Sequence, residues 1–364
     1  MNLGYPASIT GRRCFRAQDA ETFQALRESP IHEGTAILPV RSELKDFEKA
    51  FDSDIDDPGD FAEIEGSISP VNPVDIATPK MNDKPMAKMK RVDIGPVTVG
   101  AGHELALIAG PCVMEPDGMT EFLAREIGAV CTGLGVPLIF KASFDKANRT
   151  SKSSFRGPGI DEGIEIFRQI KAETGLPVTT DVHEPSQAGR IAEVVDLLQV
   201  PAFLARQTDL LEACASTGRP VNVKKGQFMA PWDMAHVISK IESAGGRGVL
   251  LTERGTTFGY GRLINDMRAI PWMRALGAPV VFDATHSVQL PSAGAGITAG
   301  ERDMIPYLSR AAVAAGCDAL FLEVHPDPDK ALSDGPNALR LTDLEPLLKQ
   351  LLAIRKAMTE TDAI

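Results

Sequence analysis

Eight short apolar runs, each followed by a segment with helical periodicity, constrain the fold of this chain more than any other feature. The runs are rich in Val, Ile and Leu, as expected for strands buried on both faces. Strands that alternate with helices predict a parallel sheet. Several intervening segments, such as DEGIEIFRQIKAETG, close on a glycine suited to a helix C-cap. The runs are LALIAG (105–110), PLIFKA (137–142), PVTTDV (177–182), LLQVPA (197–202), PVNVKK (220–225), GVLLTE (248–253), PVVFDA (279–284) and ALFLEV (319–324).

Eight strand–helix units are the number that closes a (β/α)8 barrel, and an open doubly wound sheet is the alternative. Polar residues that gather where the runs end favour the barrel, because there the ends converge on one face. We therefore predict an α/β chain with a (β/α)8 (TIM) barrel, preceded by a β-hairpin in RVDIGPVTVG (91–100). The polar residues are Cys112, Lys141, Asp181, His183, Gln199, Lys224, Glu253, Arg254, Asp283, His286, Glu323 and His325.

The first 88 residues differ from the rest of the chain. They contain the acidic run FDSDIDDPGDFAEIEG and the proline-spaced SISPVNPVDIATPKMNDKP, with little sustained periodicity. Such composition predicts a largely disordered extension, although short helices at 20–28 and 43–51 stay open. We divide the chain into an extension, 1–88, and a barrel domain, 89–364.

The overall charge narrows the classes of partner that the protein can bind. The 364 residues carry a formal net charge of −11, which argues against nucleic-acid or anionic-membrane partners because these require a basic face. No apolar stretch is long enough to span a membrane, and no signal-peptide pattern opens the chain. Five cysteines without CxxC spacing fit a reducing compartment, so we expect a cytoplasmic protein.

A basic cluster stands out against this acidic background. Between Lys141 and Arg156 the chain places five cations against one acid, Asp145. Each of them alone reads as a solvated side chain. Further cations follow two other strands, at Lys224, Lys225 and Arg254, and cations from three strand ends suit two phosphate groups. We predict a doubly phosphorylated ligand or ligand pair. The five cations of the cluster are Lys141, Lys146, Arg149, Lys152 and Arg156.

Four residues offer a metal site. Cys112, His286, Glu323 and Asp334 follow or end the first, seventh and eighth strands, and the first and eighth strands are neighbours in a closed barrel. One thiolate, one imidazole and two carboxylates suit a transition metal such as zinc, iron or manganese. Spacing alone leaves open a packing role for Cys112 and a purely hydrogen-bonding role for His286.

The strand ends, read together, resemble the 3-deoxy-D-manno-octulosonate 8-phosphate synthases, which condense phosphoenolpyruvate with D-arabinose 5-phosphate. The resemblance covers residues from about 91 to 352. The KANR tetrad is more similar to these enzymes than to the sister 3-deoxy-D-arabino-heptulosonate 7-phosphate synthases. The matching segments are LIAGPCVMEP, FKASFDKANRTS, SSFRGPG, TDVHEP, LQVPAFLARQTDL, VNVKKGQF, RGTTFGY, VVFDATHSVQLP and EVHPDPDKALSDGPNAL.

The resemblance implies two substrate-binding groups. One would hold phosphoenolpyruvate and consists of Lys141, Gln199, Lys224 and Arg254. The other would hold the sugar phosphate and consists of Ser143, Lys146, Asn148 and Arg149, the last with a possible reach into a neighbouring subunit. The family forms homotetramers and acts in lipopolysaccharide (Kdo) biosynthesis, so a homo-oligomer is expected.

The resemblance also implies a metal and a catalytic set. Cys112, His286, Glu323 and Asp334 match the ligands of the metal-dependent branch, whereas an Asn replaces Cys112 in the metal-independent branch. Lys146 or His286 would supply a proton to the developing alkoxide, and Asp181 or Asp334 would handle the water proton. The expected catalytic residues are Lys141, Lys146, His286 and Asp334.

Some alternatives stay open. The segment GRLINDM departs from the Asn-Leu pair usual in the family, which puts the loop contacts there in doubt. A seven-carbon-sugar synthase or a sialic-acid-type synthase would share the enol donor. A non-catalytic phosphosugar-binding barrel would bind its ligand without releasing phosphate.

Overall fold

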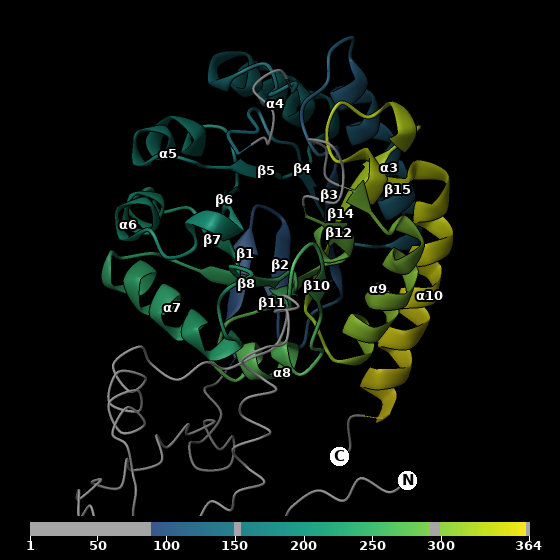
Figure 1. Ribbon diagram of the computed structural model, residues 1–364. Helices are drawn as coiled ribbons and strands as arrows, with labels where there is room; N and C mark the ends of the chain where they lie inside the picture. The colour runs from purple at the N-terminus through teal and green to yellow at the C-terminus, as the bar shows by residue number, and fades with distance from the viewer. Residues whose placement is uncertain (1–88, 149–153, 292–298, 362–364) are drawn as a thin grey trace, which may run out of the picture. The chain divides into compact units, whose positions relative to one another are not determined.

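The computed structural model describes residues 89–148, 154–291 and 299–361, in which eight parallel strands close into a ring (Figure 1). Neighbours along the chain pair in order, and β14 closes the ring by pairing with both β11 and β3. The predicted (β/α)8 barrel is confirmed, and the open sheet is wrong. The strands are β3 (Ala106–Gly110), β4 (Leu138–Lys141), β5 (Val178–Asp181), β6 (Leu197–Val200), β7 (Val221–Lys224), β8 (Val249–Glu253), β11 (Val280–Asp283) and β14 (Ala319–His325).

A helix follows each barrel strand and lies outside the ring (Figure 1). The glycine stop signals hold at α3 and α4, whose C-caps Gly135 and Gly175 take left-handed φ angles of 69° and 68°. The helices are α3 (Met119–Leu134), α4 (Ile160–Thr174), α5 (Pro185–Ala192), α6 (Thr208–Ser216), α7 (Met234–Ser243), α8 (Ala269–Arg274), α9 (Ile305–Ala314) and α10 (Leu341–Thr361).

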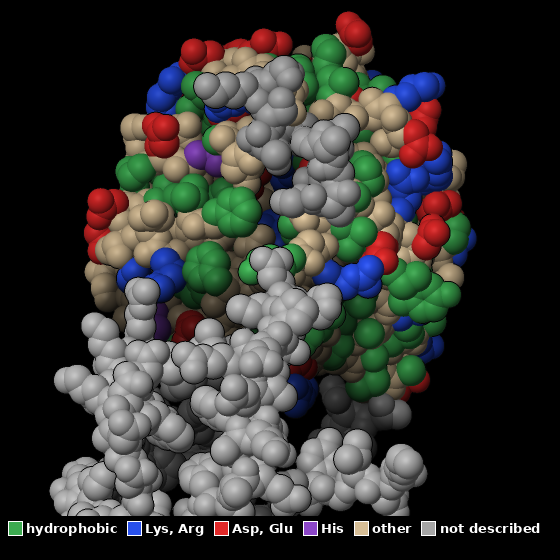
Figure 2. Space-filling view, in the orientation of Figure 1, with side chains coloured by type: hydrophobic (Ala, Val, Ile, Leu, Met, Phe, Trp, Pro, Cys, Tyr) green, Lys and Arg blue, Asp and Glu red, His purple; other side chains and the backbone are tan. Residues whose placement is uncertain are grey.

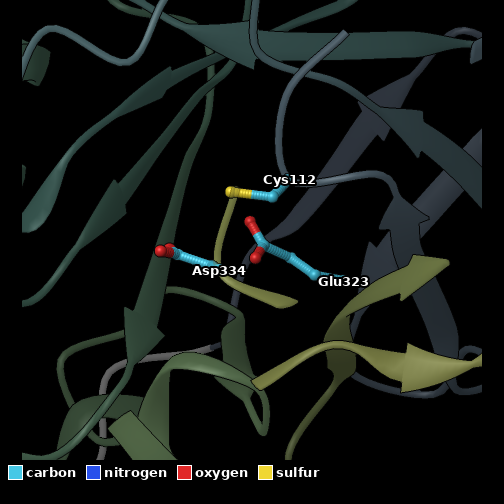
Figure 3. Close-up of side chains that lie close together, drawn as sticks. All are labelled: Cys112, Glu323 and Asp334. Carbon is cyan, nitrogen blue, oxygen red and sulfur yellow. The ribbon is translucent and has the colours of Figure 1, made fainter. Parts of the chain in front are cut away.

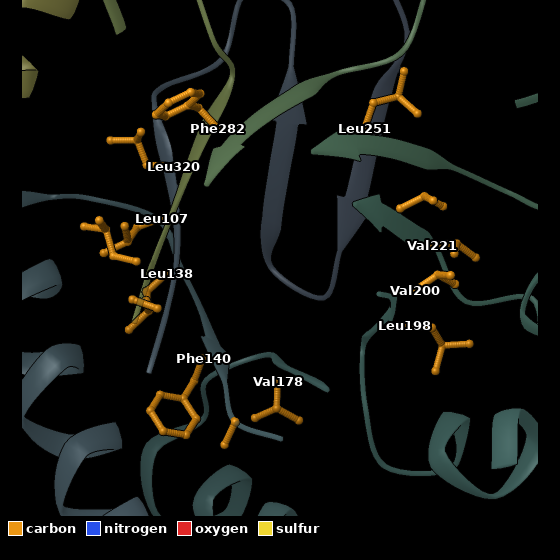
Figure 4. Close-up of a cluster of buried hydrophobic side chains, with 14 of the residues drawn as sticks. Leu107, Leu138, Phe140, Val178, Leu198, Val200, Val221, Leu251, Phe282 and Leu320 are labelled. Atoms are coloured by element: carbon orange, nitrogen blue, oxygen red, sulfur yellow. The ribbon is translucent and has the colours of Figure 1, made fainter. Parts of the chain in front are cut away.

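Two apolar layers follow from the alternation of side chains along each strand. In β4, Leu138 and Phe140 belong to the cluster between strands and helices, whereas Ile139 belongs to the cluster inside the ring. Figure 4 shows the outer cluster, with side chains from successive strands turned outwards toward the helices. The next inward position after Ile139 is Lys141, so the interior changes from apolar to charged along the strand.

The hairpin formed by β1 (Arg91–Ile94) and β2 (Val97–Gly100) is confirmed and packs against the inside of the ring. Its buried side chains share one cluster with inward-facing residues of the barrel strands. The hairpin therefore fills the end of the barrel opposite the charged positions. Its four packed side chains are Val92, Ile94, Val97 and Val99.

Short elements extend the loops at the carboxyl ends of the strands. Two antiparallel pairs and one strand beside β14 rigidify these loops. They are β9 (Thr256–Thr257) with β10 (Leu263–Ile264), β12 (Gln289–Leu290) with β13 (Ala299–Gly300), and β15 (Leu339–Arg340). Single 3₁₀ turns lie at Ala202–Leu204, Pro231–Asp233, His286–Val288, Arg302–Met304, Pro328–Lys330 and Gly335–Asn337.

The expected extension, residues 1–88, lies outside the described residues, and its disorder and domain boundary stay predictions. Among the helices that the structure describes, none has the length and apolar character needed to cross a bilayer.

Candidate functional site

A cavity of about 630 Å³ opens at the carboxyl ends of the barrel strands. Figure 2 shows this face hollowed near its centre, with Lys and Arg side chains visible between hydrophobic ones. Active sites of this fold lie at this end because the loops after all eight strands meet there. The described lining includes the polar side chains of Lys141, Lys146, Asn148, Asp181, His183, Gln199, Lys224, Gln227, Arg254, His286, Gln289 and Asp334.

Lys224 and Arg254 form one cationic wall of this cavity. The Lys224 ammonium donates to the Asp283 carboxylate and lies 3.4 Å from His286 Nδ1. Arg254 Nη2 donates to Gln289 Oε1 at 2.7 Å, while its buried Nη1 has no hydrogen-bond partner among the described residues. Burial lowers the pKa of both cations, although nearby carboxylates, Asp283 first, oppose that effect. A buried N–H without an acceptor favours an anion in this wall.

Lys146 and Asp181 form the opposite wall. Lys146 Nζ lies 3.8 Å from Asp181 Oδ2 and 3.9 Å from Glu323 Oε1. Burial opposes the charge on Lys146, but the surrounding negative groups, including Glu323 and Asp181, raise its pKa overall. Burial likewise acts against the Asp181 carboxylate, yet Lys141 and Lys146 hold its pKa well below the usual range. Both groups are therefore charged at neutral pH.

A chain of buried hydrogen bonds orients Gln199. The Thr252 hydroxyl donates to Asn222 Oδ1 at 2.6 Å, and Asn222 Nδ2 donates to Gln199 Oε1 at 3.1 Å. Gln199 Nε2 in turn donates to Asp181 Oδ1 at 2.5 Å. Sequence reasoning missed Asn222 and Thr252, which stand in buried strands without forming a motif. A polar residue at an inward position of an otherwise apolar strand is the signal that marks them.

Three of the four predicted metal ligands form a compact cluster (Figure 3). The ligand atoms of Cys112, Glu323 and Asp334 all lie within 4.8 Å of one another. Glu323 Oε2 is buried and has no hydrogen-bond partner in the described structure. Its other oxygen faces cations, which lower the pKa of Glu323 to about 2 despite burial. A buried carboxylate oxygen without a donor, next to a thiol, fits a divalent transition metal.

His286 lies beside this cluster. Its Nε2 is 3.4 Å from Glu323 Oε1 and 3.9 Å from Asp334 Oδ2. The Nδ1 atom lies 2.7 Å from Asp283 Oδ2, so the hydrogen on Nδ1 donates to that carboxylate. This pairing leaves the Nε2 lone pair directed at the cluster, which is how carboxylates commonly orient a histidine ligand. Asp283, predicted only as one of the polar residues at the strand ends, is thus a supporting residue of the site.

Two predicted cations do not contribute to the cavity. Lys225 is fully buried on the other side of its strand, where its Nζ donates to Met229 O and lies 3.5 Å from Glu253 Oε2. Neighbouring strand residues face opposite sides, so only one of two adjacent lysines can face inward. Arg156 pairs with Asp145 and does not line the cavity. The expectation that these two cations surround the ligand is therefore wrong.

Other predicted residues also occupy different positions. Ser143 is fully buried and does not line the cavity; its hydroxyl donates to Asp181 Oδ2 at 2.5 Å, and its contact with a substrate stays a prediction. His325, which ends β14, lies 3.3 Å from Glu115 Oε2, and its Nδ1 accepts from Asp327 N. Predicted residues Arg149 and Lys152 lie outside the described residues.

The remaining predicted residues converge as expected. Lys141 Nζ donates to Cys112 O at 2.9 Å and lies 3.3 Å from Glu323 Oε1, and Asn148 lines the outer cavity. Cations from several strand ends thus surround one cavity beside a cluster of sulfur, nitrogen and oxygen donors. Fold and cavity together define a (β/α)8 barrel with a cation-lined cavity at the end where enzymes of this fold have their active sites.

Comparison with known proteins specifies the family. Residues 78–360 match the DAHP synthetase I family, and the chain belongs to it. The chain is 56% identical over 263 residues to a 2-dehydro-3-deoxyphosphooctonate aldolase of Synechococcus sp., covering 72% of this chain and 93% of the relative. A protein of the same name from Cyanothece sp. is 54% identical, over 74% of this chain and 99% of the relative. Another, from Geobacter sulfurreducens, is 56% identical, over 73% of this chain and 97% of the relative.

Proposed function

We propose that the protein condenses phosphoenolpyruvate with D-arabinose 5-phosphate and water, forming 3-deoxy-D-manno-octulosonate 8-phosphate and phosphate. The product is the eight-carbon sugar acid phosphate of Kdo, and hence lipopolysaccharide, biosynthesis. The names of the relatives support this reaction over the rival synthases. The observation that carries the proposal is the meeting of Lys146, Lys224 and Arg254 around one cavity, since the reaction must bring two phosphorylated anions together.

The cations address the main physical obstacle of this reaction. Carbon 3 of the enol must attack the sugar aldehyde, water adds to carbon 2, and phosphate leaves by cleavage of its C–O bond. Two anions repel each other in water, whereas fixed cations in a partly dry cavity neutralise them and hold the reacting carbons together. We assign Lys141, Gln199, Lys224 and Arg254 to phosphoenolpyruvate, and Lys146, Asn148 and Arg149 to the sugar phosphate.

Proton transfer is proposed for titratable residues that line the cavity. Lys146 is an ammonium, because nearby negative groups raise its pKa, and it can donate to the alkoxide formed from the aldehyde. Lys141, which is held against Glu323, would help to keep that acid ionised. Asp181 and Asp334 line the same cavity as candidate acceptors of the water proton, and His286 is the alternative to Lys146 as donor only in the state in which its Nε2 carries a proton and binds no metal.

A divalent transition metal fits the cluster of Cys112, His286, Glu323 and Asp334, and zinc, iron or manganese all suit these donors. When bound, such an ion polarises an oxygen of the substrate or of water. The residues of the chain set the geometry around it: Asp283 fixes the His286 ring, and Ser333 lies 2.9 Å from Cys112 Sγ.

The reaction is tested by offering the purified enzyme phosphoenolpyruvate with one sugar acceptor at a time. We expect phosphate release and an eight-carbon product with D-arabinose 5-phosphate. Erythrose 4-phosphate should react far more slowly, and N-acetylmannosamine should not react. Preferential turnover of erythrose 4-phosphate would identify the seven-carbon-sugar synthase instead. Binding of both substrates without phosphate release would indicate a non-catalytic barrel.

We propose that the protein is a homo-oligomer, in line with the tetramers of the family it resembles. Several aromatic side chains near the cavity mouth are exposed, and apolar exposure of this kind is typical of interaction surfaces. Light scattering on the full chain should give a mass several times 39.0 kDa; a monomer mass would contradict the proposal. The aromatic residues are Phe203, Phe228, Phe258 and Tyr260.

A cytoplasmic location is proposed because the cysteines of the described chain are free thiols, and because a thiol at the metal cluster must stay reduced to bind. Cell fractionation checks it, and recovery in an oxidising compartment would contradict it.

A further inference from the structure

Phe321 lies at the boundary between the apolar interior of the barrel and the charged floor of the cavity. It is fully buried in the middle of β14 and belongs to the cluster that includes the hairpin. Its partners across the two neighbouring strands are Ile108 of β3 and Asp283 of β11. Glu323, two residues further along β14, points to the same face of the strand and reaches the metal cluster. Phe321 is thus the apolar residue directly beneath the site.

Two lysine ammonium groups lie close to the ring of Phe321. Lys224 Nζ lies 3.5 Å from the ring centroid, and Lys141 Nζ lies 5.5 Å from it. The His286 ring is tilted against it, with 5.7 Å between centroids and 51° between planes. The face of an aromatic ring is negative and attracts an ammonium within about 6 Å, most strongly when both are removed from water. Both lysines meet that condition, because neither is more than 5% exposed.

A ring face differs from a carboxylate as a partner for Lys224. The ammonium already donates to Asp283, and a second strong acceptor would compete with the substrate for its two remaining hydrogens. The ring attracts the charge without fixing the direction of those hydrogens, and it blocks movement of the ammonium down into the barrel. An N–H of Lys224 can then point into the cavity.

We propose that Phe321 is a positioning residue of the reaction, whose ring face holds the Lys224 ammonium at the cavity floor so that it can bind the anionic enol substrate. The inference rests on the proposed function, because it takes phosphoenolpyruvate as the ligand of Lys224. The alternative is that Phe321 only fills volume between the hairpin and the site. A packing role would respond to side-chain size and shape but not to the electrostatic potential of the ring.

Fluorinated phenylalanines separate these roles. Site-specific incorporation of 4-fluoro-, 3,5-difluoro- and 3,4,5-trifluorophenylalanine at position 321 weakens the negative ring face stepwise with little change in volume. We expect the Kd for phosphoenolpyruvate, measured by calorimetry on the metal-loaded enzyme, to rise stepwise by about tenfold across the series. The KM for the sugar phosphate at saturating phosphoenolpyruvate should change by less than about twofold, because the ring contacts of Phe321 among the described residues are with Lys141, Lys224 and His286, none of which is assigned to the sugar.

Phe167 provides the matched control. It is equally buried, in α4, but belongs to the outer cluster between helices and strands. The same series there should leave the Kd unchanged, and thermal unfolding of every variant would show that the fold is retained. A flat series at position 321, or equal effects at both positions, would overturn the inference. If the unsubstituted enzyme binds no phosphoenolpyruvate, the proposed function itself fails; if it forms product and the series is flat, only the role of Phe321 fails.

Discussion

Lys224→Met should lower kcat/KM for phosphoenolpyruvate by about 10³-fold, the effect expected when one charged donor to a reacting anion is lost. Lys224 is 5% exposed, lines the cavity and donates to the Asp283 carboxylate, which positions its ammonium. Methionine has a similar length and tolerates a buried position, and Asp283, which loses the ammonium, keeps hydrogen bonds from His286 and Thr285, so the loss should appear in catalysis more than in folding. Initial rates of phosphate release over a range of phosphoenolpyruvate concentrations measure it.

Lys225→Met is the matched control, since the two lysines are adjacent and both buried. Lys225 faces Met229 O, Thr256 and Glu253, outside the cavity. Its replacement leaves Glu253 without its cation, so we expect a lower melting temperature but a kcat/KM within about tenfold of the original at 25 °C. Equal losses of activity in the two variants, with equal melting temperatures, would contradict the assignment of Lys224 to the site.

Removing divalent metal should lower activity by at least about 100-fold, because an ion that polarises a reacting oxygen contributes several kcal/mol to the transition state. Dialysis against a chelator followed by elemental analysis relates metal content to rate. Activity should return on adding zinc, iron or manganese salts, and the metal that restores most activity per bound ion identifies the preferred one. Full activity in a preparation shown to be metal-free would refute the four-ligand proposal.

Variants of the thiol ligand sharpen this test. Cys112→Ala should reduce bound metal per chain, measured by elemental analysis, because it removes one of three donors that lie within 4.8 Å of one another. Cys112→Asn should weaken the dependence of activity on metal. Cys131→Ala is the control, since Cys131 is a buried thiol of α3 within the outer apolar cluster. Unchanged metal content in Cys112→Ala would remove Cys112 from the ligand set.

The fold was readable from the sequence because the pattern repeats. Each apolar run became a barrel strand, and the glycine after α4 ended that helix as expected. The signals for buried strands and for alternating helices are spread over many positions. Misassigning one strand–helix unit therefore does not change the predicted fold. The hairpin at 91–100 was also predicted, but its place inside the ring was not, because a contact between distant segments leaves no mark on a two-strand pattern.

The residues of the site could be predicted only in part from the sequence, because residue type does not fix the direction of a side chain. Lys224 and Lys225 are the same residue type, and only the alternation of side chains along β7 and the residue after it decides which one enters the cavity. Arg156 is neutralised by Asp145, eleven residues away, through a loop geometry that no spacing rule predicts. Supporting groups such as Asn222 and Asp283 act through other side chains, so they become visible only when hydrogen bonds are traced.

The hairpin that fills one end of the ring affects the order in which the two substrates bind. With β1 and β2 packed there, reactants must arrive and products depart through the loops at the other end. Lys141 and Lys224, assigned to phosphoenolpyruvate, are almost fully enclosed, whereas Asn148 is exposed near the rim. If phosphoenolpyruvate occupies the inner part of the cavity and the sugar phosphate the outer part, phosphoenolpyruvate must bind first. Sequential kinetics with the enol acid binding first, visible in dead-end inhibition patterns, would follow from the shape of the barrel alone.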